Sequence, residues 1–156
     1  MIRKSLVIFI ILLICALLET ALLSNVIFLP VVPDLLLLVV VYISVFNGSL
    51  TGEATGFVSG LLLDFLTTVP LGLNCLLRTL IGFLAGLFHD VLNVSKILIP
   101  ALLAFMSTIA KALLVGFISF FFPNGVITYD LFSAAFGMEL LFNVILAPLV
   151  FAFLSL

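Results

Sequence analysis

Long apolar runs separated by short polar breaks dominate the chain and predict helices. The runs are much longer than the roughly 4–8 residues of a typical strand, and they show no strict alternation of polar and apolar positions. Turn signals of Pro and Gly at residues 70–72 and 123–125 separate some of them. We predict an all-α protein whose six apolar segments are residues 6–29, 34–46, 54–66, 73–88, 97–122 and 128–156.

The composition makes these segments membrane helices. Of the 156 residues, 66% are hydrophobic and only 8% are charged, and the mean hydropathy is +1.61. Soluble domains have about 45–50% apolar and about 25% charged residues, so a soluble enzyme is excluded. At about 1.5 Å per residue the chain gives about 234 Å of helix, enough for six crossings of a hydrocarbon core about 30 Å thick. We predict one polytopic membrane domain over residues 1–156.

Two of the segments, 34–46 and 54–66, are short for a membrane crossing, because each makes only about 20 Å of helix. They form either a re-entrant hairpin or two short crossings sheltered by neighbouring helices. We favour two crossings. The first run, 6–29, is longer than the roughly 7–15-residue apolar core of a signal peptide, so we expect it to stay as the first helix.

The few basic residues predict the orientation. Short cytoplasmic loops carry an excess of Lys and Arg, and an N-terminus inside the cell places Arg3, Lys4 and Lys96 on the cytoplasmic side. We therefore predict both termini in the cytoplasm. The formal net charge is −2 and no basic run is present, so nothing indicates a nucleic-acid partner.

Catalytic and cofactor motifs are missing from the sequence. It contains no Ser-His-Asp, Gly-rich phosphate or Cys/His metal pattern. Cys15 and Cys75 lie within apolar runs without ligand spacing, and we interpret them as small core residues. His89, beside Asp90, is expected at the membrane interface. We predict no enzymatic activity, no metal and no cofactor.

Asp64 and Arg78 lie on either side of the turn at 70–72, at similar predicted depth. A charge inside a membrane costs about 2.5–3.5 kcal/mol on insertion scales and needs a partner. We predict an Asp64–Arg78 ion pair; separate snorkelling of each side chain to the interface is the alternative.

Glycines recur every fourth residue in the same two segments. They are Gly52, Gly56 and Gly60 before Asp64, and Gly82 and Gly86 after Arg78. Small residues at this spacing let two helix backbones approach closely. We predict that the two helices pack through these faces, although the stripe drifts by about 40° per step and should not all meet one straight helix.

Glu19, Lys111 and Glu139 lie deep in the first, fifth and sixth segments, with Asn143 one turn after Glu139. A Glu19–Lys111 or Glu139–Lys111 pair would join these helices. Buried pairs fix register more surely than they stabilise, so a structural lock is the favoured interpretation. The alternative is a substrate or proton site, since intramembrane carboxylates often line such paths.

Asp34 follows Pro33 at the start of the second segment. A carboxylate at this position can accept hydrogen bonds from the free N–H groups of the first helical turn. We predict that Asp34 caps this helix, with contact to a partner as the alternative.

Three stretches of sequence resemble one known family. They are PDLLLLVVVY (33–42), GEATGFVSGLLLDFL (52–66) and PLGLNCLLRTLIGFLAG (70–86), and the chain is similar in them to the rod shape-determining protein MreD family. The resemblance implies six helices folded like the substrate-binding subunits of energy-coupling-factor transporters. It also implies that Asp34, Asp64 and Arg78 lock the fold or face a partner. The loop HDVLNVSK (89–96) is less basic than the family pattern.

The family resemblance further implies a function. It implies a non-enzymatic component of the bacterial cell-elongation machinery in the inner membrane. Such a protein binds the single-span protein MreC and acts with the MreB filament and the RodA–transpeptidase synthase.

A different class, the vitamin-binding subunit of a transporter, remains as an alternative. It would place Glu19, Lys111 and Glu139 around a cavity with convergent polar groups. Such subunits dock through small residues every four positions on the first helix, whereas Ala16 and Ala21 are five apart.

Overall fold

The computed structural model describes residues 2–22, 31–92, 97–122 and 133–155. The elements are α1 (Ile2–Leu17), a π-helical turn η1 (Leu18–Leu22), α2 (Leu35–Asn47), α3 (Ser49–Leu66), α4 (Leu73–Gly86), α5 (Leu98–Phe121) and α6 (Ala134–Leu154). Within these ranges the fold is all-α and contains no strand, as the apolar pattern predicts. Helix α3 begins at Ser49 rather than Ala54, because the polar residues before the apolar run continue the same helix.

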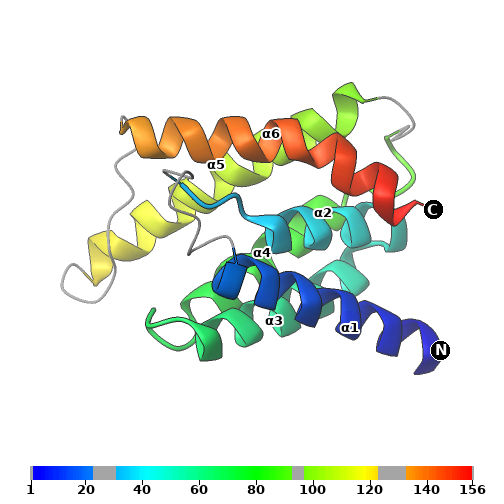
Figure 1. Cartoon of the computed structure of the whole chain (residues 1–156), viewed down its shortest axis with the longest axis horizontal. Helices are drawn as coiled ribbons and strands as arrows, with labels where there is room; N and C mark the ends of the chain where they lie inside the picture. The colour runs from blue at the N-terminus through cyan, green and yellow to red at the C-terminus, as the bar shows by residue number, and fades with distance from the viewer. Residues whose placement is uncertain (1, 23–30, 93–96, 123–132, 156) are drawn as a thin grey trace.

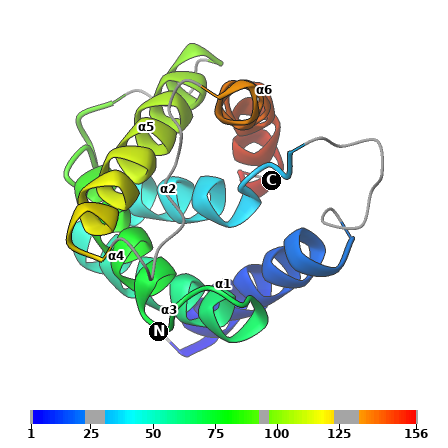
Figure 2. The same cartoon turned by 90° about the vertical axis from the view of Figure 1, so that its left-hand side faces the viewer.

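Helix α2 lies in the middle of the bundle, with the other helices around it (Figure 2). Six consecutive side chains, Leu36 to Val41, are at most 2% exposed. A helix that is apolar on all sides is stable only where neighbours cover all of it, and α1, α3, α4, α5 and α6 all contact α2. Its 13 residues make about 20 Å of helix, so α2 is shorter than the bilayer core and is sheltered by longer helices.

The helices run back and forth through tight junctions. Gly48 alone joins α2 to α3, with φ of +87°, and Gly72 precedes α4, with φ of +96°. Both values lie in the left-handed region that favours glycine. The start of α1, the end of α6 and the α2–α3 junction lie at the same end of the bundle, which we call the terminal end (Figure 1).

The α3–α4 hairpin is the most closely packed pair in the fold. A methyl group added to Gly52 would overlap the backbone carbonyl of Gly82, and one added to Gly82 would overlap that of Gly52. The same holds for Gly56 against the backbone of Arg78. Gly60 and Gly86 also face backbone atoms of the opposite helix. The predicted packing of the two helices through these faces is confirmed, and the whole glycine stripe of α3 meets α4.

The outer surface of the bundle is apolar. Within the described residues, two helices, Leu98–Phe121 and Ala134–Leu154, are long and apolar enough to cross a membrane, while Leu6–Ala21, Leu35–Asn47 and Leu73–Gly86 are apolar but shorter. Helix α6 exposes a stripe of large side chains at helical spacing: Met138, Leu141, Ile145, Leu149 and Phe153. An apolar stripe along a whole helix would favour aggregation in water, whereas lipid-facing surfaces are ordinarily apolar.

Candidate functional site

The candidate site is built around the first turn of α2, which starts inside the bundle. Free N–H groups at a helix start need acceptors, and three side chains supply them. Asp34 Oδ1 accepts from the N–H of Leu37 at 2.9 Å, so Asp34 caps the helix as expected. Glu19 Oε2 accepts from Leu36 at 3.1 Å, and Asn143 Oδ1 accepts from Asp34 at 2.9 Å. The positive end of the helix dipole also favours these carboxylates.

Asp34 is the centre of the ion pairs at this point. Its Oδ1 accepts a hydrogen bond from Arg78 Nη2 at 2.6 Å, and its Oδ2 accepts one from Lys111 Nζ at 2.7 Å. Lys111 also donates to Glu139 Oε1 at 2.8 Å. Glu19 Oε1 lies 3.9 Å from Arg78 Nη2. The contact between Lys111 and Glu139 is one of the two that the sequence suggested.

Neutral polar groups complete the arrangement. Asn143 Nδ2 donates to Thr108 Oγ1 at 3.1 Å, and this bond joins α6 to α5. We call the set Glu19, Asp34, Arg78, Thr108, Lys111, Glu139 and Asn143 the charge cluster. Its members come from η1, α2, α4, α5 and α6, so it connects five of the elements at one level of the fold.

Most of the charge cluster is buried, and Glu19 and Lys111 are partly buried. Asp34 is 3% exposed, Arg78 4% and Glu139 6%, and Asn143 is fully covered. Separating charges of opposite sign in such a place leaves an unpaired buried charge, which costs about 3–5 kcal/mol. The arrangement therefore fixes the relative positions of the helices strongly, whatever its net contribution to stability.

The predicted Asp64–Arg78 pair is wrong. Asp64 instead accepts hydrogen bonds from the backbone N–H groups of Gly72, Asn74 and Cys75, at 2.9, 3.1 and 3.1 Å. The hairpin turn brings the first turn of α4 directly beside Asp64, and its free amides satisfy the carboxylate. Arg78 lies about one and a half turns further along and faces α2 instead of α3.

The pairs of Asp34 with Arg78 and Lys111 were not predicted. The available signal was Asp34 after a proline at the head of a short apolar helix, which suggests a helix start within the membrane. Such starts often bind charged groups. The first turn of α2 lies beside residues of η1, α4, α5 and α6. The capping residue Asp34 therefore also pairs with the cations Arg78 of α4 and Lys111 of α5.

Other polar residues lie away from the charge cluster. His89 Nδ1 lies 2.8 Å from the carbonyl oxygen of Val45, and its Nε2 lies 3.3 Å from Asp90, so it links the end of α4 to the end of α2. Cys15 and Cys75 are free thiols. Among the described residues, no group of His, Cys, Asp and Glu could hold a metal ion.

Comparison with protein families now adds to this geometry. The family model of the rod shape-determining protein MreD matches residues 2–156. The chain belongs to the MreD family. The MreD family consists of shape-determining membrane proteins and is not a known enzyme family, so this protein has a role in rod-shape determination. Comparisons with curated proteins and with solved structures gave no match.

Proposed function

We propose that this protein is a non-enzymatic scaffold of the bacterial cell-elongation machinery, spanning the inner membrane six times with both termini in the cytoplasm. It binds an MreC-like single-span protein and acts with an MreB-like filament and the RodA–transpeptidase synthase. Membership of the MreD family supports the role in cell elongation. The positions of Arg3, Lys4 and Lys96 in the sequence, and the location of both chain ends at the terminal end (Figure 1), support the orientation.

The charge cluster is the observation that carries the scaffold function. Its ionic groups bond to one another and to the first turn of α2, and through them α2 is tied to η1, α4, α5 and α6. A structure held in this way presents a fixed outer surface. A single-span partner then binds to a preformed face and loses less free energy in ordering the protein.

The partner surface lies outside the α3–α4 glycine faces. Those faces are covered by each other's backbone, so they are not free to receive a partner helix. The exposed faces carry large apolar side chains, for example Phe57 on α3, Phe83 on α4, Leu113 on α5 and Leu141 on α6. Helix association in lipid depends on packing of such faces.

The transporter-subunit alternative receives no support from the site. It requires Glu19, Lys111 and Glu139 to converge on a cavity, whereas Lys111 bonds directly to Asp34 and Glu139, and Glu19 to the backbone of Leu36. Binding of a vitamin-like solute is therefore an outcome of the experiment and not a second proposal.

The experiment is photo-cross-linking in a rod-shaped host. A photoreactive amino acid replaces Phe57, Phe83, Leu113 or Leu141, one at a time, and the buried aromatic Phe151 provides the covered control. We expect a cross-link to the single-span partner from at least one exposed position, none from Phe151, and co-purification of the two proteins. Absence of any cross-link and of co-purification, or tight binding of a vitamin-like solute by the purified protein, would refute the scaffold.

A further inference from the structure

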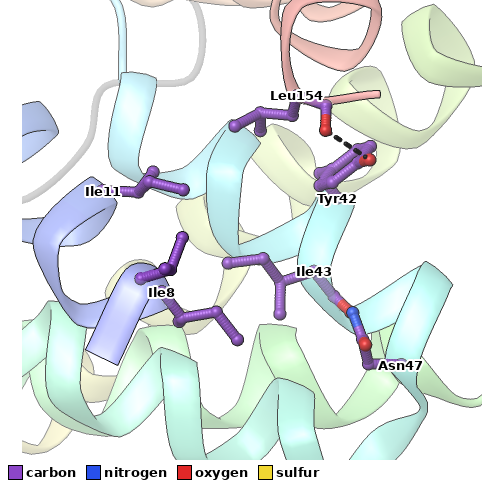
Figure 3. A pocket seen from close by; sticks show the side chains of 7 residues that line it. Ile8, Ile11, Tyr42, Ile43, Asn47 and Leu154 are labelled. Atoms are coloured by element: carbon purple, nitrogen blue, oxygen red, sulfur yellow. Dashed lines mark hydrogen bonds between the residues drawn. The ribbon is translucent and has the colours of Figure 1, made fainter. Parts of the chain in front are cut away.

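An apolar groove lies between α1, α2 and the last turn of α6, away from the charge cluster. Ile8 and Ile11 of α1 form one wall, Ile43 and Tyr42 of α2 form the floor, and Leu154 forms part of the other wall (Figure 3). Its volume is about 390 Å³. Because Val7 also lines it and is half exposed, the groove opens to the outer surface of the bundle, where lipid surrounds the protein.

The size of the groove selects its occupant. A helix with side chains is about 10 Å wide, so a partner helix could place only its side chains in the groove and not its backbone. A hydrocarbon chain is much thinner and can lie along the groove for much of its length. The side chains that line an empty apolar groove lack van der Waals contacts on one side, and an acyl chain of the surrounding lipid would supply them.

The groove has a polar end. Asn47 lines it at the last residue of α2, and its side chain is exposed. The hydroxyl of Tyr42 donates to the carbonyl oxygen of Leu154 at 2.9 Å, which closes the junction of α2 with α6 (Figure 3). These groups belong to the terminal end of the bundle, so a lipid headgroup would lie beside Asn47 while its acyl chain runs inward past Ile8 and Ile11.

Charge at the same end selects the headgroup. Arg3 and Lys4 are in the first turns of α1, one turn before the groove residues Val7 and Ile8. Basic residues near a membrane surface attract anionic lipids by about 1 kcal/mol each, which for two residues amounts to a preference of roughly 30-fold. No acidic residue lines the groove.

We propose that this groove is a binding site for an anionic phospholipid, with one acyl chain between α1, α2 and α6 and the headgroup beside Asn47 and the basic start of α1. The site is independent of the scaffold function and of the partner surface. It makes α1 a helix whose packing depends on lipid, because the acyl chain takes the place of protein side chains between α1 and α6.

The test uses the absence of tryptophan from the chain. V7W places a single fluorophore at the mouth of the groove, and L102W places one at an exposed position of α5 that does not line it. Both proteins are reconstituted in phosphatidylcholine vesicles containing increasing fractions of phosphatidylglycerol with brominated acyl chains. We expect V7W fluorescence to reach half of its final quenching at a roughly 30-fold lower phosphatidylglycerol fraction than L102W fluorescence.

Three further measurements decide the interpretation. In the V7W background, R3Q/K4Q should move the half-quenching fraction to that of L102W, and brominated phosphatidylcholine should not quench V7W preferentially. Native mass spectrometry of the unaltered protein should retain phosphatidylglycerol, which removes any dependence on the reporters. Identical quenching curves for V7W and L102W, or loss of V7W quenching when a single-span partner is added, would overturn the proposal.

Discussion

Replacing Gly56 by Ala provides the sharpest test of the close packing of α3 against α4. The new methyl group would overlap the carbonyl oxygen and carbon of Arg78 and the nitrogen of Thr79. All three are backbone atoms of α4, so no side chain can rotate away, and the two helices must separate. Overpacking usually costs about 1–3 kcal/mol. We expect the upper end, because moving the backbone of Arg78 also disturbs its 2.6 Å contact with Asp34.

The net effect includes the preference of Ala over Gly in a helix, which contributes roughly 0.5–1 kcal/mol in the opposite direction. The expected loss in free energy of unfolding is therefore about 2 kcal/mol, up to a roughly 30-fold change in the folded population. Gly116 on α5 is the matched control, because a methyl group there meets nothing within 4 Å. The measurement is reversible unfolding in mixed micelles with increasing SDS. If G56A and G116A are equally stable, the close approach of α3 and α4 is refuted.

Three further sets of substitutions test the polar contacts by the same unfolding measurement. Asp64→Ala removes the acceptor of three backbone amides and should cost about 2 kcal/mol, whereas Asp64→Asn, which keeps one oxygen, should cost less; equal losses would argue against capping. Lys111→Met should be strongly destabilising, by about 3 kcal/mol, and addition of Glu139→Gln should recover about 1 kcal/mol; strictly additive losses would show that the pair is not coupled. Tyr42→Phe should cost about 1 kcal/mol through loss of the bond to Leu154, and an unchanged stability would remove that bond from the fold.

The helices and the closing of the α3–α4 hairpin could be predicted because they depend on local patterns. Apolar runs and turn residues locate α2, α4 and α5, and a four-residue glycine spacing implies close packing wherever two such stripes occur in neighbouring helices. The depth of a charged residue along its helix could also be estimated, which is why the Lys111–Glu139 contact was one of the two pairs suggested.

The direction in which each charge faces could not be predicted. Arg78 and Asp64 have similar depth, yet one faces α2 and the other the first turn of α4. The choice depends on how α4 is rotated about its axis, and that rotation is set by the glycine contacts and by α2, not by the turn between α3 and α4. Whether α2 and α3 each cross the bilayer stays a prediction, since helix length alone does not decide it.

Asp34 and Glu19, the two carboxylates of the charge cluster nearest Arg78, differ in how closely they hold its cations. Asp34 holds Arg78 and Lys111 at 2.6 and 2.7 Å, while Glu19 lies 3.9 Å from Arg78 and accepts a hydrogen bond from the N–H of Leu36. Asp34→Asn therefore leaves the buried Arg78 and the partly buried Lys111 without their closest anion. We expect a loss of about 3–5 kcal/mol, enough to unfold a marginally stable protein.

Glu19→Gln is the matched comparison, because the amide oxygen of Gln can still accept from the N–H of Leu36. It gives up the long contact with Arg78 and also removes the repulsion between Glu19 and Asp34, so we expect a loss below about 1 kcal/mol. Both variants are measured by unfolding in micelles and by rescue of rod shape in cells lacking the native protein. If Glu19→Gln is as harmful as Asp34→Asn, Glu19 has a role beyond anchoring the start of α2, and the cluster cannot be explained as a lock centred on Asp34.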